Sequence, residues 1–259
     1  MSLSANKERI ESLLRKSEEL IEESKKTDYR MPVILPFIPP ILILSGAGLM
    51  VIVFIGLSSM DTHPGYLALT AMGFVIYILA ILIAILLNFY IVYKWIKRRN
   101  DHFARTLMFF ENLVEIADLL KFRRSHEMKS RLNELREINS HVKSALANTI
   151  LTIIPLYIFY VYHFLNKDFA EHSEKEKLLL AEFFDEVREK IPSFTRRIEE
   201  FNIVPDRSTL LYLILTIIFP VFSIYWVYTL TKDPNKHFES HSVLERELVT
   251  ALKQLLLQP

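Results

Sequence analysis

The feature that most constrains this chain is an apolar run over residues 67–93, which contains neither a charged residue nor a proline. About 20 such residues in a helix cross the roughly 30 Å hydrocarbon core of a bilayer. The run therefore predicts a membrane-spanning helix. A second uncharged run covers residues 32–57, and its early prolines place the start of a regular helix near Pro39, because proline fits the first helical turn.

Two further apolar runs, residues 144–165 and 209–230, are each long enough to span and each contain one proline, Pro155 and Pro220. A proline inside a membrane helix is tolerated when neighbouring helices satisfy the freed backbone groups. It can also mark a hairpin that enters and leaves the bilayer on one face, which is the alternative. On length, the sequence predicts an all-α integral membrane protein with four membrane helices in two hairpins.

The distribution of basic residues predicts the orientation of these helices. Lys and Arg are frequent in residues 1–31 and 94–143 and absent from the turn at 58–66. By the positive-inside rule, both termini are cytoplasmic and the protein lies in the cell membrane. Four crossings would place residues 166–207 outside. Glutamine occurs only at Gln254 and Gln258 while Lys, Glu, Arg and Ile are abundant, which favours a thermophilic prokaryote.

The polar stretches between the apolar runs have the periodicity of amphipathic helices, and together they predict a polar helical domain. The predicted division of the chain is an N-terminal amphipathic helix (1–31), a first transmembrane hairpin (32–97), a polar helical segment (98–143), a third membrane segment (144–165), a polar helical hairpin (166–207), a fourth membrane segment (208–231) and a C-terminal amphipathic helix (232–259).

One unit of the sequence is repeated: an aromatic-ended apolar helix that continues into a charged helix. Residues 90–114 align without gaps with residues 225–249, and FAEHSEKE at 169–176 is echoed by FESHSVLE at 238–245. Identical residues in the longer alignment are Tyr90/Tyr225, Val92/Val227, Tyr93/Tyr228, Lys97/Lys232, Asn100/Asn235, His102/His237, Phe103/Phe238, Leu113/Leu248 and Val114/Val249.

The stretch LTIIFPVFSIYWVYTLTKDPNKHF resembles a family of small prokaryotic multi-pass membrane proteins that is known only as a domain of unknown function. In that family an apolar segment ends in aromatic residues and a Lys-x-x-Asn-x-His-like turn follows. The resemblance, within residues 209–245, implies a membrane location and no particular activity.

A stripe of large apolar residues with alternating spacings of four and three is the clearest helical pattern in the polar part. Its period is that of a coiled coil, and Pro192 predicts a kink or a helix boundary within it. We expect it to pack on the chain's own helices, with a protein partner or self-association as the alternative. The stripe consists of Leu180, Phe184, Val187, Ile191, Phe194, Ile198 and Phe201.

His237, His241 and Glu245 share one helix face at i, i+4 and i+8 and are the candidate ligands for a zinc-like ion. No further cluster completes the site in the sequence, and the pattern is not HExxH. The interpretation favoured by the sequence is therefore a membrane-interface helix whose histidines bond to headgroups or backbone. No metal, cofactor or catalytic residue is predicted.

The composition argues against several classes of function. The chain contains no Cys, which excludes disulfides and thiolate metal sites, and the formal charge of +1 gives no sign of nucleic-acid binding. No nucleotide-binding or hydrolase motif is present. We therefore expect a non-enzymatic membrane scaffold or tether that contacts the bilayer and a protein partner. The alternative is a small oligomeric channel lined by Asn148, Thr149 and Thr152.

Overall fold

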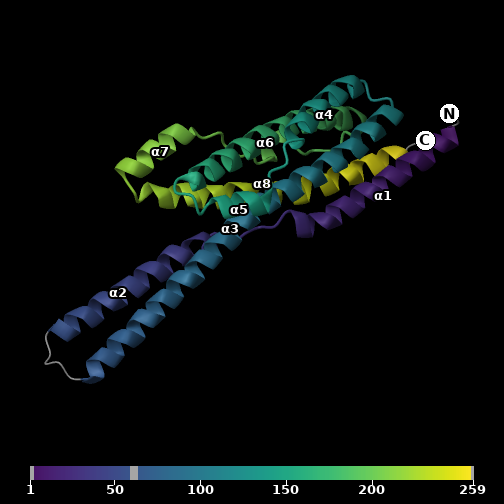
Figure 1. Ribbon diagram of the computed structural model, residues 1–259. Helices are drawn as coiled ribbons and strands as arrows, with labels where there is room; N and C mark the ends of the chain where they lie inside the picture. Colours follow the sequence, from purple (N-terminus) through teal and green to yellow (C-terminus); the bar gives the residue numbers. More distant parts are fainter. Residues whose placement is uncertain (1–2, 59–63, 258–259) are drawn as a thin grey trace.

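The computed structural model describes residues 3–58 and 64–257, and every regular element within these ranges is helical (Figure 1). The all-α prediction is confirmed. The α-helices are α1 (Leu3–Thr27), α2 (Ile38–Ser58), α3 (Pro64–Leu119), α4 (Ser125–Asn139), α5 (Ala145–Leu151), α6 (Tyr157–Lys190), α7 (Thr209–Ile218) and α8 (Phe222–Leu257).

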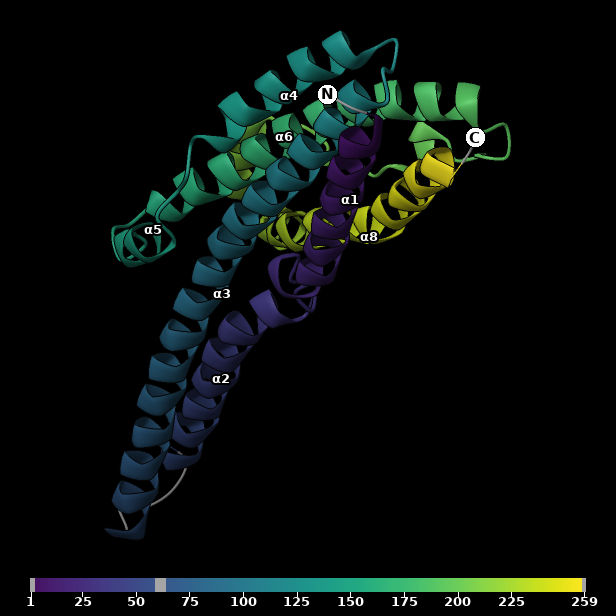
Figure 2. The same cartoon turned by 90° about the vertical axis from the view of Figure 1, so that its right-hand side faces the viewer.

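Helices α2 and α3 form an antiparallel hairpin that projects from the other helices (Figures 1 and 2). The spans Leu35–Gly56 and Ala68–Leu119 are the two stretches long and apolar enough to cross a membrane in the described part of the chain. Large apolar side chains on the projecting part face outward, including Leu44 at 70% and Phe54 at 71% exposure. Such surfaces suit lipid rather than water.

Helix α3 runs without a break from the projecting hairpin into the polar domain. It runs from Pro64 to Leu119, although the sequence divides this stretch into a hairpin ending at residue 97 and a separate polar segment. No proline interrupts residues 65–119, so nothing in the backbone chemistry forces an end. The hairpin and the polar domain therefore share one helix.

The third and fourth predicted membrane segments are bent rather than straight. The first bends between Leu151 and Tyr157, where Leu156 has φ 69°, and the second between Ile218 and Phe222. Pro155 and Pro220 lie in these bends. Each proline removes a helical hydrogen bond and so accounts for the bend. We call residues 144–165 the first elbow and residues 208–231 the second elbow. Four spanning helices are therefore not confirmed.

The polar domain is a bundle of α1, α4, α6, α8 and the second half of α3 around one large apolar cluster. Six members of the predicted stripe are buried in this cluster and Ile198 packs against it. Helix α6 ends at Lys190, and the chain continues to residue 208 with only a short 3-10 turn at Ile198–Glu200. The stripe is therefore a core seam within the chain, and its second half does not form the predicted helix.

Candidate metal centre

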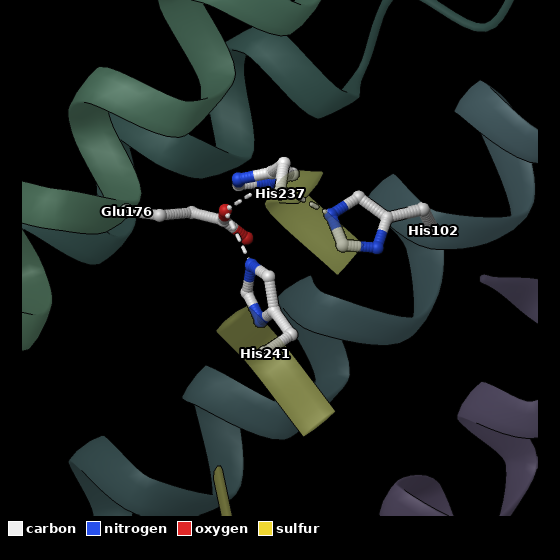
Figure 3. Close-up of side chains that lie close together, drawn as sticks. All are labelled: His102, Glu176, His237 and His241. Carbon is white, nitrogen blue, oxygen red and sulfur yellow. Dashed lines mark hydrogen bonds and ion pairs between the residues drawn. The ribbon is translucent and has the colours of Figure 1, made fainter. Parts of the chain in front are cut away.

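Four buried side chains converge where α3, α6 and α8 meet (Figure 3). Helix α3 supplies His102, α6 supplies Glu176, and α8 supplies His237 and His241 from successive turns of one face. Their exposed fractions are 0–1%. One nitrogen or oxygen from each residue lies within 4.8 Å of the corresponding atoms of the other three, which is the arrangement of a metal-ligand set.

The inner atoms of this group are the three Nε2 nitrogens and one carboxylate oxygen. Oε2 of Glu176 lies 3.2 Å from Nε2 of His237 and 3.0 Å from Nε2 of His241. Nε2 of His102 lies 3.1 Å from Nε2 of His237. Ligand atoms about 2.0–2.1 Å from a tetrahedral ion are about 3.3 Å apart. These three separations therefore match the distances between ligand atoms in tetrahedral coordination.

Each imidazole has a separate acceptor behind it, on the Nδ1 side. Nδ1 of His102 lies 3.1 Å from Oδ1 of Asp28. Nδ1 of His237 donates to the carbonyl of Asn202 at 2.8 Å, and Nδ1 of His241 donates to Oε1 of Glu245 at 2.8 Å. Ligating histidines in metalloproteins regularly have their outer nitrogen bound to a carboxylate or a carbonyl in this way.

These outer partners fix the ring tautomers. A carboxylate or a carbonyl only accepts, so the proton of each neutral ring is on Nδ1 and the lone pair is on Nε2. In the neutral rings the lone pairs of His102 and His237 point at one another. Nε2 of His241 points at the Glu176 carboxylate, and it carries a proton when no ion is bound. Facing lone pairs repel unless a cation lies between them. The tautomers therefore define a site for a cation.

The charges around the ligand set lead to the same conclusion. Arg105 donates from Nη1 to both carboxylate oxygens of Glu245, at 2.9 and 2.8 Å, and from Nη2 to Asp28 at 2.8 Å. One guanidinium thus faces two outer carboxylates, and Glu176 adds a third inside. With neutral imidazoles these groups carry two excess negative charges, which are costly to bury without compensation. A divalent cation would balance them.

The pKa values of the outer and inner groups reflect this electrostatic environment. Burial disfavours a charged imidazole, yet Glu176 and Glu245 outweigh it and raise the pKa of His241 to about 10. Burial would raise the pKa of Glu176, but His172 and His241 hold it well below its usual range. Likewise, His102 and Arg105 overcome burial and lower the pKa of Asp28. Without an ion, His241 therefore carries a second proton between Glu176 and Glu245, and a metal cation would take the place of that proton.

His172 supports the ligand set from the far side of Glu176. Its Nε2 lies 2.9 Å from Oε1 of Glu176, the oxygen that does not face His237 and His241, and its Nδ1 bonds to Oδ1 of Asn139 at 3.0 Å. Its ring stacks on Phe103 with centroids 3.7 Å apart. Burial lowers the pKa of His172 to about 4 despite the adjacent carboxylate. It packs against Glu176 on the side away from the candidate ligands.

Aromatic rings close the site against water. The ring of His102 lies 4.5 Å from that of Phe238, and Phe201 lies 5.2 Å from both His237 and His241, measured between centroids. All of these phenylalanines are buried. A dry shell strengthens electrostatic interactions between an ion and its ligands.

The structure changes the ligand set considered from sequence. His237 and His241 are brought together, but Glu245 lies behind His241 and is bound by Arg105. Of the predicted headgroup or backbone contacts, His237 makes a backbone one, to the carbonyl of Asn202, and both side chains are buried in the polar domain. His102 and Glu176 complete the group in place of Glu245. The sequence repeat is the signal that could identify these two ligands. It aligns His102 with His237, and its shorter copy aligns Glu176 with Glu245.

No known family model, curated protein or solved structure matches this chain. The resemblance to a family of small membrane proteins therefore stays an expectation from the sequence.

Proposed function

We propose that this chain is a membrane-anchored metal-binding protein in which His102, Glu176, His237 and His241 hold one divalent transition-metal ion. The observation that carries the proposal is the convergence of three Nε2 lone pairs and one carboxylate oxygen, each ring held by its own outer acceptor. Imidazole and carboxylate ligands without sulfur suit zinc and its neighbours in the first transition row. Zinc fits a buried set of four protein ligands best.

The chemistry of such a site is structural rather than catalytic. Structural zinc has four protein ligands, whereas catalytic zinc keeps a position for water or substrate. All four ligands here are buried, on three different helices. An ion would therefore tie α3, α6 and α8 together, and its binding free energy would add to folding.

With its helices fixed by the ion, the polar domain would serve as the rigid platform of a membrane scaffold or tether in the cell membrane. The basic residues that flank the α2–α3 hairpin support cytoplasmic termini. The channel alternative has less support. The hydroxyls of Thr149 and Thr152 donate to carbonyls of their own segment, at 2.7 and 2.6 Å, and so are occupied within the first elbow.

Metal analysis of the detergent-purified protein tests the site. About one zinc per chain is expected after growth in zinc-replete medium, and Glu176→Gln and His241→Ala should lose it. His126→Ala is the matched control, because His126 is an exposed histidine on α4, and it should retain the metal.

A second readout does not depend on the variants. Wild-type protein stripped with a chelator and refilled with Co²⁺ should show the strong visible absorption of a tetrahedral cobalt site, and Zn²⁺ should abolish it. A lower melting temperature in chelator is also expected. Protein that carries no metal, binds no Co²⁺ and melts at the same temperature with chelator would overturn the proposal.

A further inference from the structure

Both elbows expose large apolar side chains and contain no charged residue between Ser144 and Leu165 or between Ser208 and Thr231. Such continuous apolar surfaces are rare where a protein faces water. The side chains more than half exposed include Ile153 and Leu156 in the first elbow, and Ile217, Phe219 and Val221 in the second.

The two ends of each elbow lie next to each other. Asp206 and Arg207 precede the second elbow and Lys232 and Asp233 follow it, and Arg207 pairs with Asp233 at 2.6 Å. A segment that crossed the bilayer would have its ends about 30 Å apart. The second elbow therefore returns to the side from which it starts.

The first elbow returns in the same way, through Arg99 of α3. This guanidinium donates from Nη1 to the carbonyl of His141, before the elbow, at 3.0 Å. From Nη2 it pairs with Asp168, after the elbow, at 2.8 Å. One side chain thus holds both ends, and the elbows also meet one another, since Nδ1 of His163 lies 2.8 Å from Oγ1 of Thr209.

The elbows lie beside the end of the apolar run in α3. An apolar cluster joins Ile91, Val92, Trp95 and Ile96 of α3 to residues of both elbows, Trp226 among them. Helices α5 and α7 lie at the end of the polar domain opposite the chain termini (Figure 1). The elbows therefore lie beside the base of the α2–α3 hairpin.

We propose that both elbows are re-entrant and insert into the hydrocarbon of a single leaflet, the one from which α3 emerges into the polar domain. The occupant of their exposed surface is lipid acyl chain, because the surface is apolar, uncharged and beside the candidate spans. The chain would then cross the membrane twice, with residues 166–207 on the same side as both termini. The four-crossing scheme places those residues on the opposite side.

Single cysteines in this cysteine-free chain test the topology. We would introduce Ser59→Cys in the connection between α2 and α3, Ser193→Cys in the polar domain and Gln254→Cys near the end of α8. An impermeant thiol reagent applied to sealed vesicles of one orientation should label Ser193→Cys together with Gln254→Cys, and Ser59→Cys only from the other face. Labelling of Ser193→Cys from the same face as Ser59→Cys would overturn re-entry.

Nitroxide labels at Ile153→Cys and Phe219→Cys test insertion. Both side chains are more than half exposed, so their replacement leaves the core intact. Lipid-soluble oxygen should broaden these spectra more than a water-soluble nickel complex does, at a depth within one leaflet. A label at Glu199→Cys, exposed in the polar domain, should show the reverse. Elbow labels that respond like the Glu199→Cys label would contradict insertion. Neither experiment depends on metal binding.

Discussion

The guanidinium of Arg105 on α3 and the carboxylate of Glu245 on α8 form a two-pronged ion pair with both side chains 1% exposed. The remaining Nη2 of Arg105 reaches Asp28, just after α1. One cation therefore joins three parts of the chain directly behind two of the candidate ligand histidines. Replacing Arg105 tests how much the stability of the polar domain depends on these ion pairs.

Arg105→Met should lower the free energy of unfolding by about 3–5 kcal/mol, because it leaves two buried carboxylates without their counter-charge. Thermal and denaturant unfolding in detergent measure the change. Arg136→Met removes an exposed pair with Glu111 and should change stability little. Equal effects of the two substitutions would show that the buried ion pair contributes no more to stability than the exposed one.

Glu245→Gln should weaken metal binding by about 10- to 100-fold without removing a ligand, because loss of an outer carboxylate makes the His241 imidazole a poorer donor. Competition with a chromophoric chelator gives the affinity. Glu239→Gln, exposed on the same helix, is the control and should bind as the wild type does. Complete loss of metal from folded Glu245→Gln would instead make Glu245 a ligand.

Phe184→Ala should destabilise the polar domain by about 3–5 kcal/mol, the usual cost of emptying a tight aromatic site. Phe184 is 1% exposed and packs edge to face on Phe194, with ring centroids 5.3 Å apart. Leu178→Ala truncates a 36% exposed side chain on the same helix and should cost much less. An unchanged melting temperature for Phe184→Ala would refute the intramolecular seam and favour a partner at this surface.

Gly46→Leu should loosen the α2–α3 hairpin, since a Cβ at Gly46 would lie 2.7 Å from Cδ2 of Tyr77 on α3. Small residues allow membrane helices to approach closely. Gly48→Leu is the matched control, because a Cβ placed there would meet no other helix within 4 Å among the described residues. Disulfide formation between Met50→Cys and Gly73→Cys, adjacent across the hairpin, should fall with Gly46→Leu only. Equal crosslinking in both backgrounds would contradict close packing at Gly46.

Local patterns predicted the helices and the seam well. The uncharged run at 67–93 lies in α3, and the spacing of Leu180, Phe184 and Val187 gave the buried face of α6. The stop near Pro192 also follows from proline chemistry. These features depend on residues close together in the sequence, so periodicity alone finds them.

Features set by contacts between distant segments could not be predicted in this way. The elbows have the length and hydropathy of spanning helices, and the pair Arg207–Asp233 that brings the ends of one together forms only in the fold. His102 and Glu176 lie far from His237 in the sequence, and no helical spacing says which helices pack together. Glu245 has the i+4 spacing of a ligand but faces the outer nitrogen of His241.

With the α2–α3 hairpin in a bilayer, as proposed, the uninterrupted course of α3 would fix the height of the candidate ion above that bilayer. His102 follows Tyr93, the last residue of the apolar run, by nine positions, and a helix rises about 1.5 Å per residue, so the ligand lies at most about 14 Å above the hydrocarbon. On the proposed topology this is the anionic cytoplasmic surface. A potential of about −30 mV there enriches divalent cations roughly tenfold over bulk solution. The membrane that anchors the protein would thus also serve as the reservoir from which its metal is drawn.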